Sequence, residues 1–217
     1  MTLTLSPQIT NESLRKPDRV AGALAGGFVV LLLATELILT LPDEADSPVF
    51  VATFYAAHRS FIITLQVLGL VAAALLGAYA WRLRPIDRVV AAAGMIMAVC
   101  AVVPGLITLV IAIVADQDHP AAAGVWNALE PRGDDVLFVG IVLFAGTVAL
   151  RLGRRMPALG VLAGLVAVSC LARLVLEAAG SSRGFLEAVG PLLFVILIAV
   201  MAVLSFLGIL RPRADSQ

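Results

Sequence analysis

Six apolar stretches, each long enough to cross a lipid bilayer, follow one another along this chain of 217 residues. A transmembrane helix needs about 20 mostly apolar residues, so six of them use about 120 residues. Since 61% of the residues are hydrophobic and the mean hydropathy is +1.03, little of the chain remains for a soluble domain. The stretches lie at about 20–41, 61–81, 89–115, 135–152, 157–177 and 186–210.

This pattern predicts an all-α polytopic membrane protein with six transmembrane helices. It excludes a soluble enzyme, a nucleic-acid binder and a disordered chain. The polar residues 1–17 are expected to form a mobile cytoplasmic tail, residues 18–211 the membrane domain, and residues 212–217 a second cytoplasmic tail. The lipid bilayer is therefore the first partner that the sequence predicts, and no nucleic acid is expected.

Basic residues gather at alternate breaks between the apolar stretches. Eleven of the fifteen lie before the first stretch, after the second, after the fourth and after the sixth. By the positive-inside rule these segments face the cytoplasm, so both termini are predicted to be cytoplasmic. Fourteen of the fifteen are arginine, which is typical of GC-rich bacterial genomes, and the predicted location is the bacterial inner (plasma) membrane. The eleven residues are Arg15, Lys16, Arg19, Arg82, Arg84, Arg88, Arg151, Arg154, Arg155, Arg211 and Arg213.

Three local features are predicted from residue type. Residues 48–57 are apolar and aromatic, and are expected to lie as an amphipathic segment on the outer surface. Pro104 removes the amide donor that the Cys100 carbonyl would use, so the third helix should bend there. Asp134 and Asp135 are expected to open the fourth helix, where carboxylates favour the exposed amides of a first turn.

Ionisable side chains inside the hydrocarbon layer cost about 2.5 to 3.5 kcal/mol each and therefore mark candidate functional residues. Glu36 shares a helix face with the small residues Gly22 and Ala25, which allow close helix approach. Arg173 and Glu177 are four residues apart and can pair along one helix. Because these groups all lie toward the outer side, the functional hypothesis is a ligand-binding polar pocket open to that side. Its predicted residues are Glu36, Arg59, Gln66, Arg173 and Glu177.

The same residues also have a purely structural interpretation. Arg173 and Glu177 then form only a pair near the interface, with the guanidinium extended toward water. Glu36 then holds helices together through Arg59 or Arg173, and Gln66 is a helix-packing residue.

Metal and cofactor sites are not predicted. His58 and His119 are the only histidines, and His119 with Asp116 and Asp118 forms only a partial ligand set without a known metal-binding motif.

Three segments resemble a family of bacterial six-helix membrane proteins that is classed only as a domain of unknown function, numbered four-three-eight-six. The first is the hairpin Arg151–Leu174, with the turn RRMPALGVLAGL. The others are EAVGPLLFVILIAVMAVLSFLGIL at Glu187–Leu210 and RVAGALAG after Asp18. The outer loop between the third and fourth stretches departs from the family pattern. The resemblance implies the six-helix topology and no assigned activity.

Three functions are compatible with this sequence. The first is a non-enzymatic protein that binds a small or lipid-like ligand, or a partner helix, in the outer pocket. This function requires the fewest specific residues. The alternatives are a membrane-embedded enzyme acting on a lipid or isoprenoid, with Glu36 as general acid, and a transporter working as a dimer. The Gly22-x-x-x-Gly26 motif adds a homodimer through this face as a further expectation.

Overall fold

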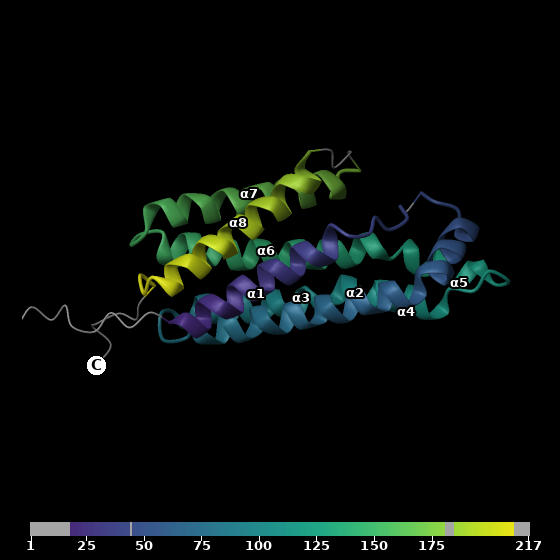
Figure 1. Ribbon diagram of the computed structural model, residues 1–217. Coiled ribbons are helices and arrows are strands. Elements are labelled where there is room, and N and C mark those ends of the chain that lie inside the picture. The colour runs from purple at the N-terminus through teal and green to yellow at the C-terminus, as the bar shows by residue number, and fades with distance from the viewer. Residues whose placement is uncertain (1–17, 44, 181–184, 211–217) are drawn as a thin grey trace, which may run out of the picture.

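The computed structural model describes residues 18–43, 45–180 and 185–210, and all regular elements in these ranges are helices (Figure 1). The tails expected at 1–17 and 212–217 lie outside the described residues. Six segments are long and apolar enough to cross a membrane, as predicted, and they identify the chain as an integral, multi-pass membrane protein. The helices are α1 (Arg19–Glu36), α2 (Pro48–Arg82), α3 (Arg88–Cys100), α4 (Val102–Val114), α5 (Pro120–Asn127), α6 (Glu130–Leu152), α7 (Pro157–Ala178) and α8 (Leu186–Phe206).

The helices run up and down in one bundle, so that the start of α1 and the end of α8 lie at the same end (Figure 1). We call this the inner end, after the positive-inside rule, because the turns 83–87 and 153–156 also lie there, and six arginines are in or beside them: Arg82, Arg84, Arg88, Arg151, Arg154 and Arg155. The opposite end, with residues 37–43, 45–47 and 115–119, is the outer end. Short inner turns join α2 to α3 and α6 to α7, and each pair packs side by side, as short connections between helices require. Which end faces the cytoplasm stays a prediction.

The third span is interrupted where the sequence predicted a bend. α3 ends at Cys100 and α4 begins at Val102, with Ala101 in a turn between them. Pro104 lies in the first turn of α4 and has no amide hydrogen for the Cys100 carbonyl. The proline therefore accounts for the break.

Residues 48–57 are continuous with the second span, and their expected place on the outer surface stays a prediction. They are the first turns of α2, a continuous helix of 35 residues that starts at Pro48. The Ser47 side chain accepts a hydrogen bond from the Phe50 amide at 3.3 Å and caps this start. At 1.5 Å per residue α2 is about 52 Å long, so it extends well beyond a hydrocarbon layer of about 30 Å.

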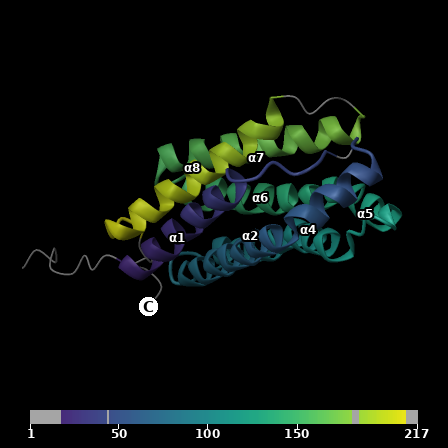
Figure 2. The same ribbon diagram turned by 45° about the vertical axis from the view of Figure 1, so that its right-hand side comes forward.

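A small second core explains why α2 starts so early. Val51, Ala52 and Tyr55 of α2 are buried with Ile111 of α4 and Ala123 of α5, at the outer end. Figure 2 shows α5 beside the ends of α2 and α4, beyond the end of α1. Val51, Ala52 and Tyr55 therefore pack against protein, whereas Val49 and Phe50 stay exposed.

The ends of two other spans also differ from the predictions. α1 ends at Glu36 and not near residue 41, and α6 begins at Glu130 and not at 135. Asp134 and Asp135 consequently lie in the second turn of α6, and their expected role in opening the helix is wrong. Pro131 suits the first turn of a helix that starts at Glu130. Amides in a first turn have no acceptor within the helix, so a proline there loses no hydrogen bond.

Gly22, expected on a dimer face, is used inside the bundle. A Cβ atom at Gly22 would collide with the Phe206 ring of α8, so the absence of a side chain lets α1 and α8 approach closely. At Gly26 a Cβ atom would meet nothing within 4 Å. Of the two glycines, only Gly26 has space for a second chain, and the homodimer stays a prediction.

Candidate functional site

The structure brings two of the five predicted site residues into contact and places the other three at separate positions. Arg173 and Glu177 pair on α7. Arg59 and Gln66 lie on α2, and Glu36 ends α1. The five residues therefore do not line one pocket.

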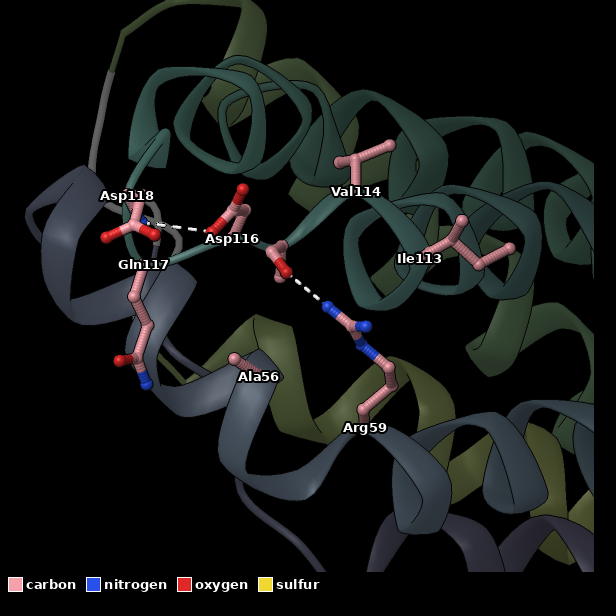
Figure 3. Close-up of a pocket in the computed structure, with 8 residues that line it drawn as sticks. Ala56, Arg59, Ile113, Val114, Asp116, Gln117 and Asp118 are labelled. Atoms are coloured by element: carbon pink, nitrogen blue, oxygen red, sulfur yellow. Dashed lines mark hydrogen bonds between the residues drawn. The ribbon is translucent and has the colours of Figure 1, made fainter.

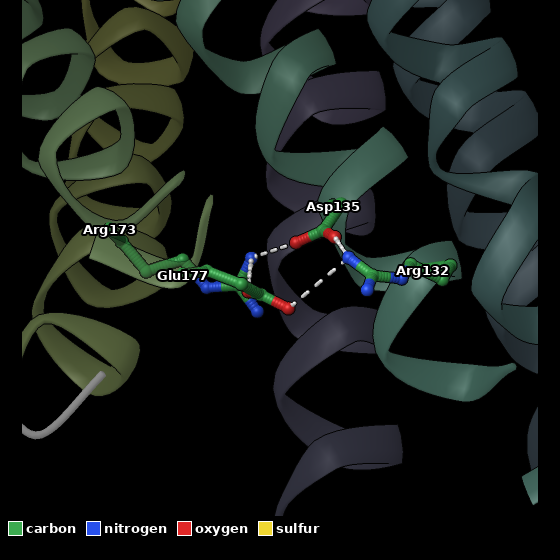
Figure 4. Close-up of polar contacts among 4 residues, drawn as sticks. All are labelled: Arg132, Asp135, Arg173 and Glu177. Carbon is green, nitrogen blue, oxygen red and sulfur yellow. Dashed lines mark hydrogen bonds and ion pairs between the residues drawn. The ribbon is translucent and has the colours of Figure 1, made fainter. Parts of the chain in front are cut away.

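Arg173 is the centre of a buried cluster of ions between α6 and α7 (Figure 4). Its Nη1 atom lies 2.5 Å from Asp135 Oδ1 and 3.0 Å from Glu177 Oε2. Arg132 binds the same two carboxylates from outside, at 3.3 Å from Asp135 and 3.9 Å from Glu177. Two guanidinium groups thus face two carboxylates, and the formal charges balance.

The Arg173 side chain is 0% exposed, so the predicted pair with Glu177 is present but does not reach water. Its guanidinium carbon lies 4.1 Å from the centre of the Phe138 ring, which offers a favourable face to a cation. Within the described residues, nothing accepts a hydrogen bond from Arg173 Nε or Nη2. Asp135 was missed as a partner because it is 38 residues away in sequence.

Glu36 is exposed at the end of α1 and forms no ion pair with Arg59 or Arg173 among the described residues. It instead interacts electrostatically with Glu130, whose carboxylate accepts a hydrogen bond from Thr108 at 3.1 Å. Tyr55 is also near Glu130, and its hydroxyl is buried. Among the described residues, the charged group that interacts with Glu36 is therefore the carboxylate of Glu130.

Gln66 lies at the contact between α2 and α4. A Cβ atom at Gly105 of α4 would lie 3.2 Å from the Gln66 amide oxygen, so the glycine makes room for this side chain. This position matches the helix-packing interpretation.

Arg59 lines a recess at the outer end, between α2 and the segment 115–118 (Figure 3). The recess has a volume of about 530 Å³. Arg59 Nη2 donates a hydrogen bond across it to the Ala115 carbonyl. Of the five predicted residues only Arg59 lines this recess; the others that line it are Ala56, Ile113, Val114, Ala115, Asp116, Gln117 and Asp118.

The carboxylates beside Arg59 are held in place by the short 115–119 connection. Asp116 accepts a hydrogen bond from the Asp118 amide at 3.0 Å and lies 3.2 Å from His119 Nδ1. These two contacts lower the pKa of Asp116, which therefore carries a full charge at neutral pH. The recess combines one cation, two carboxylates and an apolar wall, and no three acidic, histidine or cysteine groups in the described part of the chain are arranged to hold a metal.

No protein-family model, curated protein or solved structure matches this chain. The family resemblance drawn from the sequence therefore stays a prediction.

Proposed function

We propose that this integral membrane protein binds a zwitterionic head group, carried by a lipid or a small amphiphile, in the recess around Arg59. The observation that carries the proposal is the juxtaposition in one cavity of Arg59, Asp116 and Asp118 with the apolar side chains of Ile113 and Val114. This is a more local form of the outer-half ligand site that the sequence predicts.

The charges of the recess match the two ends of such a head group. A guanidinium group carries five N–H donors, and Arg59 uses one nitrogen to bind the Ala115 carbonyl. The remaining donors can bind a phosphate or a carboxylate in a planar, charge-assisted contact. Asp116 and Asp118 can accept from an ammonium group of the same ligand, and the exposed Ile113 side chain can contact its apolar part.

The enzyme and transporter alternatives have less support from this geometry. General acid catalysis by Glu36 requires Glu36 on the wall of the substrate cavity, and Glu36 does not line the Arg59 recess. Transport requires a path toward the inner end, and the recess is lined only by outer-end residues.

The test is a titration of the detergent-solubilised protein with short-chain phosphatidylethanolamine, followed by native mass spectrometry. Dihexanoylglycerol, which has the acyl chains but no charged head group, is the comparison ligand. We expect Arg59→Gln to weaken phosphatidylethanolamine binding at least about tenfold, because a charged hydrogen bond contributes about 1.5 to 3 kcal/mol.

Arg88→Gln is the matched control, because Arg88 is also exposed on a spanning helix but lies at the inner end. It should leave the affinity unchanged within about twofold. Equal binding of phosphatidylethanolamine and dihexanoylglycerol would contradict the proposal. So would an Arg59→Gln protein that melts like the wild type and binds with wild-type affinity.

A further inference from the structure

We propose that the inner end carries a second binding site, for the phosphate of an anionic lipid head group. The site is a recess of about 220 Å³ beside the turn between α6 and α7. It is lined by Asp87, Leu150, Arg151, Arg154 and Arg155. The inference is independent of the proposed outer ligand, because the two recesses share no residue and lie at opposite ends of the bundle.

Arg151 is held in place by Asp87. Its Nε atom lies 3.0 Å from Asp87 Oδ2, so the two terminal nitrogens of the guanidinium are not used by this contact. The other oxygen of Asp87 caps α3 by accepting from the amides of Val89 and Val90, at 2.8 and 3.2 Å. Asp87 therefore fixes the direction of Arg151 while its own second oxygen is occupied.

The Asp87 carboxyl is charged at neutral pH. Partial burial raises its pKa, but the amides of Val90 and Val89 and the Arg151 guanidinium together hold the pKa below its usual value. The recess thus contains one carboxylate against three guanidinium groups, which leaves an excess of two positive charges.

Arg154 and Arg155 supply that excess. Both are exposed in the turn that follows α6, and neither forms an ion pair with another described residue. Neighbouring guanidinium groups repel one another unless an anion lies between them. A phosphate with oxygens on several sides can accept from more than one arginine, which is the geometry that guanidinium groups bind best.

A lipid phosphate fits this place better than a phosphate free in solution. Leu150 lines the recess with 77% of its surface exposed, which offers a contact to an acyl chain. Trp81 is also exposed near the inner end, with Arg84 stacked 3.8 Å from its ring centre. Tryptophan gathers at head-group depth, and basic pockets at the cytoplasmic ends of spanning helices bind anionic lipids.

The experiment uses the full chain in detergent and three probes: short-chain phosphatidylglycerol, short-chain phosphatidylcholine and inorganic phosphate. Binding is followed by native mass spectrometry and by the shift in melting temperature. We expect phosphatidylglycerol to bind at least about tenfold more tightly than phosphatidylcholine, since only the former has a net negative charge. The Arg154→Gln/Arg155→Gln double variant should lose at least about tenfold of that affinity.

The matched control is Arg19→Gln/Arg88→Gln, which removes two exposed inner-end arginines that do not line the recess. It should change phosphatidylglycerol affinity less than about twofold. An equal loss in both double variants would overturn the site in favour of a diffuse positive surface. Phosphatidylglycerol and phosphatidylcholine binding equally would overturn it as well, and competition by inorganic phosphate at the same affinity would show a free-phosphate site instead.

Discussion

Arg173 and Arg151 form similar contacts at opposite ends of the bundle. Each binds an aspartate on another segment: Arg173 of α7 binds Asp135 of α6, and Arg151 of α6 binds Asp87 at the start of α3. The surroundings are different. The Arg173 side chain is 0% exposed and the Arg151 side chain 53% exposed.

The difference shows how burial decides the role of an arginine–carboxylate pair. Around Arg173 two cations face two anions, so the cluster is already neutral and serves to hold α6 against α7. Around Arg151 the arginines outnumber the carboxylates and the recess is open. A buried pair that loses one partner leaves an uncompensated charge, whereas an exposed pair has water to replace the partner.

The largest expected effect comes from removing the buried cation. Arg173→Met leaves Asp135 and Glu177 facing each other in the bundle, with the exposed Arg132 as their ion-pair partner among the described residues. Breaking a buried pair costs about 3 to 5 kcal/mol, and we expect a loss of that size in the free energy of unfolding. The measurement is reversible unfolding by sodium dodecyl sulfate in mixed micelles.

Two further variants make this test specific. Arg132→Met removes a cation that binds the same carboxylates but is 73% exposed, so it should cost less than about 1 kcal/mol. Adding Asp135→Asn and Glu177→Gln to Arg173→Met removes the unpaired charges and should restore much of the stability. If Arg173→Met and Arg132→Met cost the same, the distinction between a buried and an exposed arginine is wrong.

A smaller effect is expected at the inner end. Asp87→Ala removes both the cap of α3 and the contact with Arg151. Loss of such a cap costs about 0.5 to 2 kcal/mol, and the exposed ion pair adds less than about 1 kcal/mol. The same unfolding assay should therefore show a loss of about 1 to 2 kcal/mol, well below that for Arg173→Met.

Asp87→Asn separates the two contributions, because asparagine keeps the capping oxygen but not the charge. It should cost clearly less than Asp87→Ala. An equal cost for both variants would mean that the ion pair with Arg151, and not the cap, carries the stability at this end.

The number and approximate position of the spans could be predicted from the sequence because hydrophobic length is a local property. The bend at Pro104 was predictable for the same reason, since a missing amide donor affects only the preceding turn. The start of α2 was not, because Val51, Ala52 and Tyr55 become buried only through contacts with α4 and α5. Hydropathy alone does not separate burial in protein from burial at a membrane surface.

The candidate sites were less predictable, because their partners are distant in the sequence. The Arg173–Glu177 pair follows from a spacing of four residues along one helix. Asp135 joins it only because α6 packs on α7, and two of the four ions in that cluster come from α6. The sequence predicted that the candidate residues lie in the outer half of the bundle. Only the packing of the helices shows that they lie at several separate positions and not in one pocket.

The smallest expected effect uses pH to weaken the open ion pairs at the inner end. Asp87 has a pKa below its usual value, because its partial burial is outweighed by the amides of Val90 and Val89 and the Arg151 guanidinium. For Asp18, partial burial raises the pKa, but the hydrogen bonds from Arg82 and from the Ala21 amide bring it below the usual value. Because the folded pKa values lie below those of the unfolded chain, both carboxylates stabilise the folded state above about pH 4. That contribution is lost as the pH falls through the folded pKa values.

The measurement is the free energy of unfolding between about pH 7 and about pH 3, for the wild type and for Asp18→Asn/Asp87→Asn. Since Asp18 and Arg82 are partly exposed, the two pairs together should account for less than about 1 kcal/mol of the wild-type decline. The double variant keeps both capping oxygens but has no charge to lose at these positions, so its curve should fall less steeply over the acidic range. Parallel curves would show that the charges of Asp18 and Asp87 add no stability to the folded state.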